Sequence, residues 1–293
     1  MNITKRHHYI PEFWIKGFVA EDGSISVFNK DKGELEKKRK SPKQIFFEWN
    51  RNSFNINGEK NDFIEKLYQL GESQFSKTHN KIIEKQEQIE LSPYEIFHLM
   101  YFISEMHWRL PSQDNNSDDY INKIAHDNSI LKVKDKITGE NISEKVFDKL
   151  KNEPFFIKTS KVIRGMEDFI RLNKNIKLEN WRLFYIPENN PQLGLLSDNP
   201  LIIRDNKTSN ILESELIFSI SKGKTIYHTN GKILREIPSE NRIDIDVLTF
   251  IQAKKMVCGS NPKYLEDIAN LSKLYDTENR VKYLKEKVFE IFE

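Results

Sequence analysis

The spacing of the apolar residues changes three times along this chain, and each change predicts a different kind of secondary structure. Residues 23–40 alternate apolar and polar positions around a turn at Gly33, which is typical of a β-hairpin. Residues 61–88 follow a helical spacing, residues 181–186 return to the strand pattern, and residues 247–275 are predicted to form two helices. This order of blocks indicates an α+β fold, with a mostly antiparallel sheet and helices layered against it.

The clearest helix signal lies in the middle of the chain. Ser92 is a typical N-cap, Pro93 suits the first helical position, and Glu95 completes a capping box. The helix is expected to end before Pro111, because a proline disfavours the helical conformation of the residue before it. The polar segment 112–119 that follows is predicted to be a mobile loop.

Length and composition allow one large domain. The chain has 293 residues, of which 38% are hydrophobic, so it can bury a sizeable core. We expect a single domain over residues 1–293, with a helical central segment at about 60–175 and a sheet-rich part at about 178–235 that is joined by the N-terminal strands.

Charge and cysteine content exclude several classes of protein. Lys and Arg number 46 against 44 Asp and Glu, a net charge of +2, so no global field demands a nucleic acid or a membrane surface. The one cysteine, Cys258, excludes an internal disulfide and a thiolate cage. The chain has no membrane-length apolar run, and its N-terminus lacks the apolar core of a signal peptide. We therefore expect a cytoplasmic protein that makes no membrane contact.

Local charge is less even than the total. Residues 37–40 form the basic run Lys-Lys-Arg-Lys, and Lys43 follows closely. Such a run either solvates a strand edge and discourages aggregation, or forms a patch that faces phosphate groups.

The segment KRHHYIPEF, residues 5–13, places two adjacent histidines before any long element. In an extended segment, His7 and His8 would point to opposite sides. No second His or Cys lies nearby at the spacing of a zinc site. Pro11 can open a helix that buries Phe13, Trp14 and Phe18.

Polar side chains recur on one face of the capped helix. His98, Phe102, Glu105 and Arg109 are separated by four, three and four residues, so they share a face. This face is either a solvated stripe with a Glu105–Arg109 ion pair, or the wall of a cleft in which Arg109 holds a carboxylate or phosphate. Glu72, on the preceding helix, is open to the same two interpretations.

A second polar cluster, Ser197–Asp198–Asn199–Pro200, lies between two apolar runs. It either forms a turn in which Asp198 or Asn199 bonds its own backbone, or it holds a carboxylate and a carboxamide at a strand end and aims them into a site.

In their order along the chain, these segments resemble the domain-of-unknown-function family 4238. The family's N-terminal "HHYVPQF"-type motif is matched by residues 7–13, and its "SDNP" turn by residues 197–200. A family glutamate on the first long helix is matched by Glu72, and an arginine-then-proline helix end by Arg109 and Pro111. The family has no assigned reaction, so the resemblance implies a shared set of polar residues without naming a function.

A histidine, a carboxylate and an arginine are what acid–base chemistry on a phosphate or acyl ester needs. Our leading hypothesis is a phosphodiester hydrolase that cleaves RNA or DNA, in a bacterial defence or toxin setting. Its expected catalytic residues are His7, His8, Glu72 and Asp198, and its expected substrate-binding residues are Arg109, Asn199 and Glu105. A divalent metal ion as cofactor is left open.

The rival hypothesis is a non-enzymatic binding protein. In this case the same residues recognise an anionic small molecule, a nucleic acid or a partner peptide. A third interpretation makes both motifs purely architectural. The sequence leaves the substrate and the oligomeric state open.

The single-site hypothesis makes a spatial prediction. At least one of His7 and His8 should lie within hydrogen-bond or single-water reach of Asp198 or Glu72. Arg109 should line the same concavity.

Overall fold

The computed structural model describes residues 5–56, 58–85, 89–124, 132–172, 176–186, 194–204 and 210–293. In the described residues, the helices are α1 (Glu12–Ile15), α2 (Phe63–Glu84), α3 (Pro93–Arg109), α4 (Asp114–Lys123), α5 (Glu144–Leu150), α6 (Pro154–Ile170), α7 (Ser239–Gln252), α8 (Pro262–Ser272) and α9 (Glu278–Glu290). The strands are β1 (Arg6–His8), β2 (Ser26–Asn29), β3 (Glu34–Leu35), β4 (Phe47–Trp49), β5 (Phe54–Ile56), β6 (Glu59–Asn61), β7 (Trp181–Tyr185), β8 (Leu196–Ser197), β9 (Ile202–Ile203), β10 (Leu216–Ser221), β11 (Lys224–His228) and β12 (Met256–Gly259).

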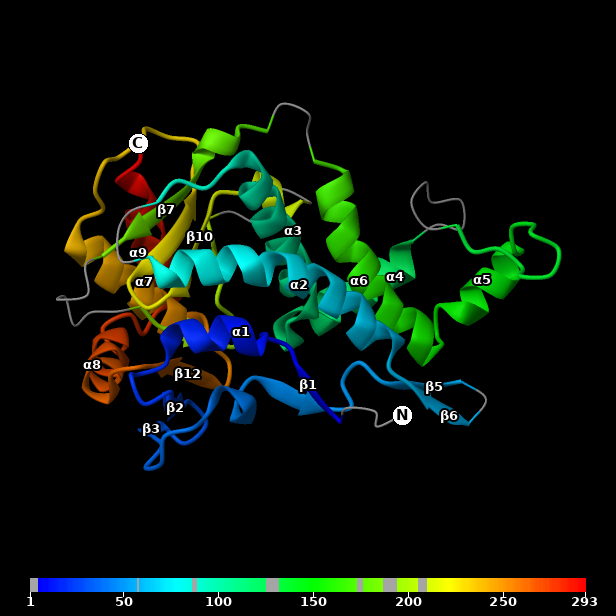
Figure 1. Ribbon diagram of the computed structural model, residues 1–293, viewed down its shortest axis with the longest axis horizontal. Helices are drawn as coiled ribbons and strands as arrows, with labels where there is room; N and C mark the ends of the chain where they lie inside the picture. Colours follow the sequence, from blue (N-terminus) through cyan, green and yellow to red (C-terminus); the bar gives the residue numbers. More distant parts are fainter. Residues whose placement is uncertain are drawn as a thin grey trace.

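The described strands form four antiparallel sheets. Two have four strands, in the orders β7-β11-β10-β9 and β3-β2-β12-β8, and two are the ribbons β1-β4 and β5-β6. Together with the layered helices this confirms the predicted α+β fold (Figure 1).

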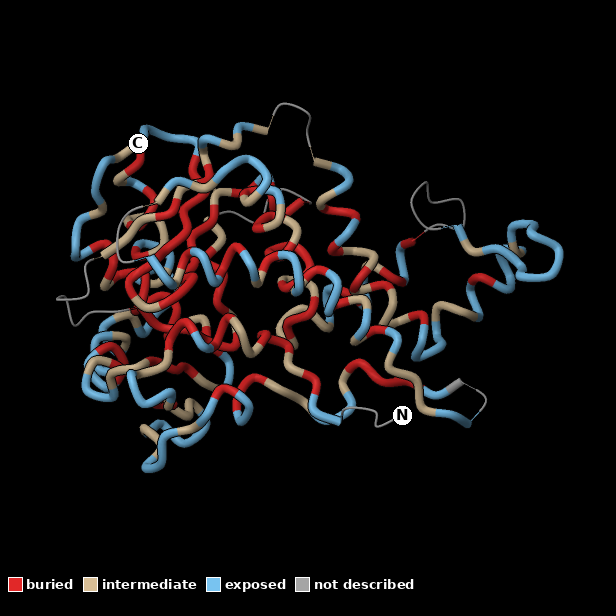
Figure 2. The backbone as a smooth tube through the Cα atoms, viewed as in Figure 1, coloured by how far each residue is buried: buried red, intermediate tan, exposed pale blue. Residues whose placement is uncertain are grey.

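In the sheet β7-β11-β10-β9, which we call the central sheet, every residue of β10 and β11 is buried (red in Figure 2). Along β10, Phe218 belongs to the core shared with α2 and α3, whereas its neighbour Ile217 belongs to the core shared with α7 and α9. Ile226 and Tyr227 of β11 divide in the same way. Side chains alternate across a strand, so a strand whose residues are all buried needs a layer of helices on each face.

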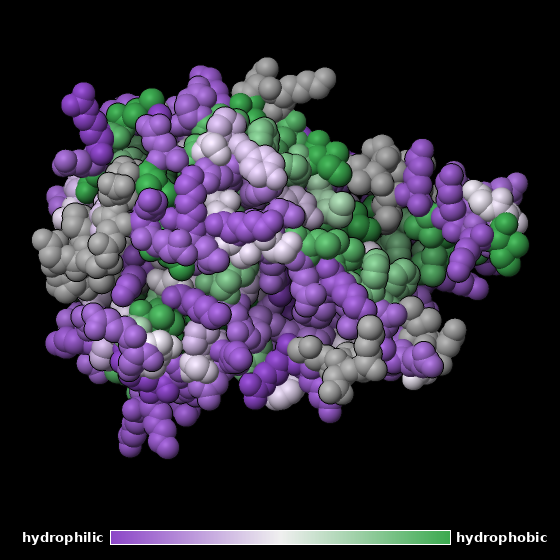
Figure 3. Space-filling model, in the orientation of Figure 1, coloured by the Kyte–Doolittle hydropathy of each residue, from purple (hydrophilic) through white to green (hydrophobic). Residues whose placement is uncertain are grey.

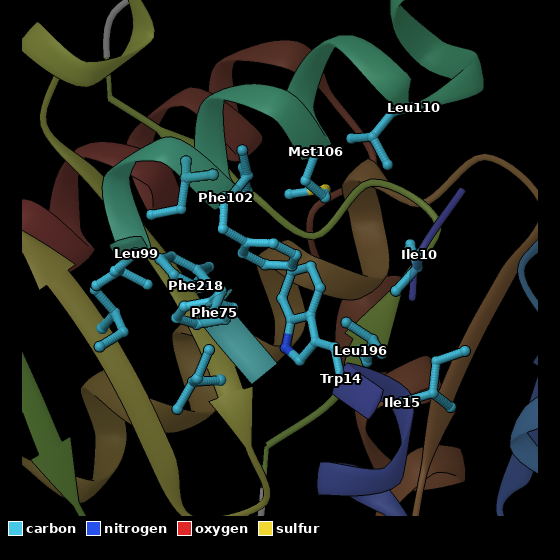
Figure 4. Packing of buried hydrophobic residues seen from close by; sticks show 14 of the residues in the cluster. Ile10, Trp14, Ile15, Phe75, Leu99, Phe102, Met106, Leu110, Leu196 and Phe218 are labelled. Atoms are coloured by element: carbon cyan, nitrogen blue, oxygen red, sulfur yellow. The ribbon is translucent and has the colours of Figure 1, made fainter. Parts of the chain in front are cut away.

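Trp14 anchors the N-terminal segment to this sheet. Its ring is fully buried between Phe102 of α3 and Phe218 of β10, with centroids 5.5 and 5.9 Å away (Figure 4). Its Nε1 donates a hydrogen bond to the carbonyl of Ser219, 3.2 Å away. Because Trp14 lies six residues after His8, this packing fixes the position of the histidine motif on the fold.

Local signals predicted several boundaries correctly. Ser92 and Glu95 form the expected capping box, and α3 ends at Arg109, before Pro111. The hairpin turn at Gly33 has a φ of 69°, a left-handed conformation that favours glycine.

Two local predictions were wrong. Residues 114–119 lie in α4 and not in a loop, because Asp114 accepts hydrogen bonds from Arg51 and Lys161, and Ile121 on the same helix is buried. Residues 256–259 form β12, the strand between β2 and β8, and do not continue the helix before them. The fully buried Cys258 lies in this strand.

The face of the molecule in Figure 3 is mostly hydrophilic, with hydrophobic side chains gathered over α6. Phe155, Met166 and Ile170 of this helix are 39%, 40% and 62% exposed. Within the described ranges, no helix has the length and apolarity needed to cross a membrane.

Candidate functional site

The β1–β4 ribbon sorts the motif residues onto two faces. Arg6 pairs with Trp49 and His8 with Phe47 on one face, and His7 pairs with Glu48 on the other. Figure 1 shows β1 passing beneath the first half of α2, and residues of both elements line one pocket. The two histidines therefore have different surroundings, as their adjacency predicted.

His7 is enclosed by protein and does not line the pocket. It is fully buried, and its Nδ1 accepts a hydrogen bond of 2.8 Å from the backbone amide of Asn52. The same Nδ1 lies 3.4 Å from Oε1 of Glu65, which also accepts a 2.5 Å hydrogen bond from the Asn52 side chain. These contacts join β1 to the start of α2, so His7 has a structural role here.

The pocket has a volume of about 420 Å³. Its charged and titratable lining consists of His8, the carboxylates Glu12, Glu65 and Glu72, and the cations Arg6, Lys43 and Arg109. Three of the predicted site residues, namely His8, Glu72 and Arg109, thus meet in one concavity.

His8 is held in its neutral form. Burial lowers the pKa of its imidazole below the ordinary value of 6.5; the nearby Glu12 opposes this effect and Arg109 adds to it. Its Nδ1 lies 3.8 Å from Oε1 of Glu12, which is too long for a hydrogen bond. Among the described residues, its buried Nε2 has no hydrogen-bond partner. A neutral imidazole with an unused ring nitrogen is able to accept a proton.

Arg109 connects three elements through one buried guanidinium. Its Nη1 donates to Glu72 of α2, its Nη2 donates to the backbone carbonyl of His8, and its Cζ lies 4.4 Å from the Tyr68 ring centroid. Only 4% of the residue is exposed. Both terminal nitrogens are therefore committed to the protein, and Arg109 positions the pocket wall instead of clamping a phosphate.

Glu105 lies behind the pocket and does not line it. It is 3% exposed, and its Oε1 has no hydrogen-bond partner in the described part of the chain. Burial is the main reason why its pKa is raised to about 8, with Arg109 opposing the shift and Glu72 adding to it. Gly71 of α2 lies close to the carboxyl group of Glu105, and Gly165 of α6 lies close to its backbone. The structure thus gives no support to the predicted substrate-binding role of Glu105.

The SDNP turn is bound to the end of α7. The two carboxylate oxygens of Asp198 accept hydrogen bonds of 2.8 and 2.6 Å from the backbone amides of Lys254 and Lys255. The Asn199 side chain donates to the carbonyl of Gln252, and the Gln252 side chain donates back to the carbonyl of Asn199. Neither Asp198 nor Asn199 lines the pocket.

The single-site prediction is therefore met only in part. Burial is the main reason why the pKa of Tyr9 is raised, and the nearby carboxylate of Asp198 adds to the shift. In the described residues, however, neither His7 nor His8 is a hydrogen-bond partner of Asp198. Asp198 binds the end of α7 and lies outside the pocket that holds His8, so the geometry gives no support to its predicted catalytic role.

Four charged residues of the pocket were not among the predicted site residues: Arg6, Glu12, Lys43 and Glu65. Arg6 and Glu12 belong to the motif KRHHYIPEF itself, and Glu12 follows His8 by four residues. Lys43 follows the basic run, whose members Arg39 and Lys40 instead pair with Asp22 and Glu36. This local pairing favours the interpretation of the run as a solvated edge.

The divalent metal ion left open by the sequence has no evident chelating cluster. Among the described residues, no three His, Cys, Asp or Glu side chains are grouped in a way that could hold a metal ion.

Replacing Asp198 by alanine is expected to lower stability by about 2–4 kcal/mol, because the amides of Lys254 and Lys255 lose their charged acceptor. Urea unfolding followed by circular dichroism measures this loss. Asp267→Ala is the matched control, since Asp267 forms an exposed pair with Lys263 and should cost well under about 1 kcal/mol. Equal unfolding midpoints for Asp198→Ala and wild type would contradict the structural role.

Glu105→Gln is expected to make the protein less sensitive to alkaline pH. The folded-state pKa of Glu105 is raised to about 8, so its contribution to stability is present at acid pH and is lost as the pH rises toward 8. The variant should gain on the order of 2 kcal/mol relative to wild type between pH 5 and pH 8. Glu266→Gln, at an exposed position of α8, should show no such trend. If the free energies of unfolding of Glu105→Gln and wild type differed by the same amount at pH 5 and pH 8, Glu105 would not be a buried protonated acid.

Comparison with known proteins yields one match. A family model described as "Protein of unknown function (DUF4238)" matches residues 6–263, from β1 into the first turn of α8. No curated protein and no solved structure matches the chain. The matched range contains the histidine motif, every residue that lines the pocket, and the SDNP turn. The chain therefore belongs to the DUF4238 family of proteins of unknown function.

Proposed function

We propose that this protein is a phosphodiester hydrolase that acts on RNA or DNA, with His8 as its general base. The observation that carries the proposal is a neutral imidazole in a pocket that also bears Arg6 and Lys43. An enzyme of this kind would act on cytoplasmic nucleic acid, as a bacterial toxin or phage-defence effector does.

His8 has the properties that a general base requires. Its lowered pKa keeps the ring neutral at pH 7, and the residue lines the pocket. When the imidazole takes a proton from the attacking hydroxyl or water, the ring becomes positively charged. Glu12, 3.8 Å from Nδ1, would stabilise that charge.

The phosphate is assigned to Arg6 and Lys43 instead of Arg109. Both side chains line the pocket from exposed positions, and neither forms an ion pair with any described residue. The pocket carboxylates have partners of their own: Glu72 pairs with Arg109, Glu65 accepts from Asn52, and Glu12 lies beside His8. A phosphate entering between Arg6 and Lys43 would meet the two cations that remain available.

Purified protein is incubated with labelled RNA and DNA, with and without Mg²⁺ or Mn²⁺, beside the His8→Ala variant. We expect His8→Ala to reduce cleavage by about 100-fold or more, the contribution of one acid–base group. The wild-type rate should fall as the pH drops below 6.5, because a protonated imidazole cannot accept a proton.

His98→Ala is the matched control, because His98 lies on α3 outside the pocket and packs on Tyr94, 4.1 Å away. It should cleave like wild type. Cleavage unaffected by His8→Ala would remove His8 from the chemistry. Tight binding of the oligonucleotides with no cleavage by wild type would favour the non-enzymatic binding protein.

A further inference from the structure

The outer face of the β1–β4 ribbon carries a row of rings that leads out of the pocket. The His8 and Phe47 ring centroids lie 5.7 Å apart, and those of Phe47 and Trp49 lie 5.6 Å apart. The guanidinium of Arg6 lies over both aromatic rings, at 5.0 and 5.2 Å from their centroids. The row therefore begins at the proposed base and ends at Trp49.

Trp49 contributes little to the core. It is 59% exposed, whereas Trp14 is fully buried in the same protein. A large aromatic ring left in solvent gains little from burial, yet it presents a flat surface to a ligand. The guanidinium of Arg6 lies over this ring, and Lys43 lines the pocket together with Arg6.

The ribbon holds the row in a fixed geometry. At one end the amide of Asn50 donates to the carbonyl of Lys5, and at the other the amide of Tyr9 donates to the carbonyl of Phe46, at 2.8 and 2.9 Å. Binding to such a surface needs little ordering of the protein, so less of the binding free energy is lost.

We propose that Trp49 stacks on an unpaired base of a single-stranded nucleic acid, while Arg6 and Lys43 bind the adjacent phosphates. This inference rests on the proposed function, and it specifies the substrate as single-stranded. Only a single strand can offer a base face for stacking, because a duplex keeps its base faces inside. Aromatic and cationic groups in one row match the alternating bases and phosphates of such a strand.

Fluorescence anisotropy with labelled oligonucleotides tests the inference in the His8→Ala background, where turnover does not consume the probe. We expect Trp49→Ala to weaken binding of a single-stranded RNA about tenfold, the loss of one stacked base. Trp49→Tyr should retain most of the affinity. Tyr283→Ala, a change of another exposed aromatic residue (63% exposed, on α9), should leave the affinity unchanged.

An oligonucleotide of the same length with abasic sites separates stacking from phosphate contact. It should bind equally to proteins with and without Trp49, and a duplex should bind more weakly than the single strand. Unchanged single-strand affinity in Trp49→Ala, or an equal loss for the abasic strand, would overturn the inference. Absence of single-strand binding would also overturn the inference, and would favour a protein as the partner of the exposed Trp49 ring.

Failure of the proposed function gives a different result. Single-strand binding that depends on Trp49, combined with no cleavage by wild type, would refute the hydrolase and keep the stacking site. Cleavage that depends on His8 but not on Trp49 would keep the hydrolase and refute the stacking site.

Discussion

The buried guanidinium of Arg109 is the contact on which the geometry of the pocket depends. It binds the backbone of His8, the side chain of Glu72 and the ring of Tyr68 at once. A cation buried this deeply is tolerated only when its partners are all in place, and loss of a partner leaves an uncompensated charge. The strand that carries His8 and the helix that carries Glu72 are therefore held in one fixed arrangement. Trp14 has a similar role in the apolar core, because its ring packs on Phe102 and Phe218 and holds α1 against the central sheet.

Patterns of short range predicted the fold well. The Ser92 capping box and the Gly33 turn depend on residues within four positions of one another, so their outcome was set locally. Two segments were decided by distant partners. The helix α7 stops at Gln252, and the amides of Lys254 and Lys255, just beyond it, bind Asp198, a residue more than fifty positions away. Residues 256–259 then pair with β2 and β8, which no helical spacing could reveal.

The residues that line the pocket were predicted in part by type but not by orientation. His8, Glu72 and Arg109 do line one pocket, whereas His7, one residue away, turns toward Asn52 and Glu65. Asp198 and Asn199 have the right chemistry for a site, but their polar atoms bond the end of α7. A sequence shows which groups are able to act, whereas the pairing of β1 with β4 decides which of the two histidines faces the pocket. Glu12 was within reach of sequence reasoning, because it lies four residues after His8 in the same motif.

The account depends most on the charge state of His8. Its imidazole can be followed by proton NMR across a pH titration, with the His8 signal assigned by its disappearance in His8→Gln. We predict a titration midpoint below 6.5, because burial and the charge of Arg109 disfavour the protonated ring more than Glu12 favours it. A midpoint at or above 6.5 would contradict a neutral base held in the pocket.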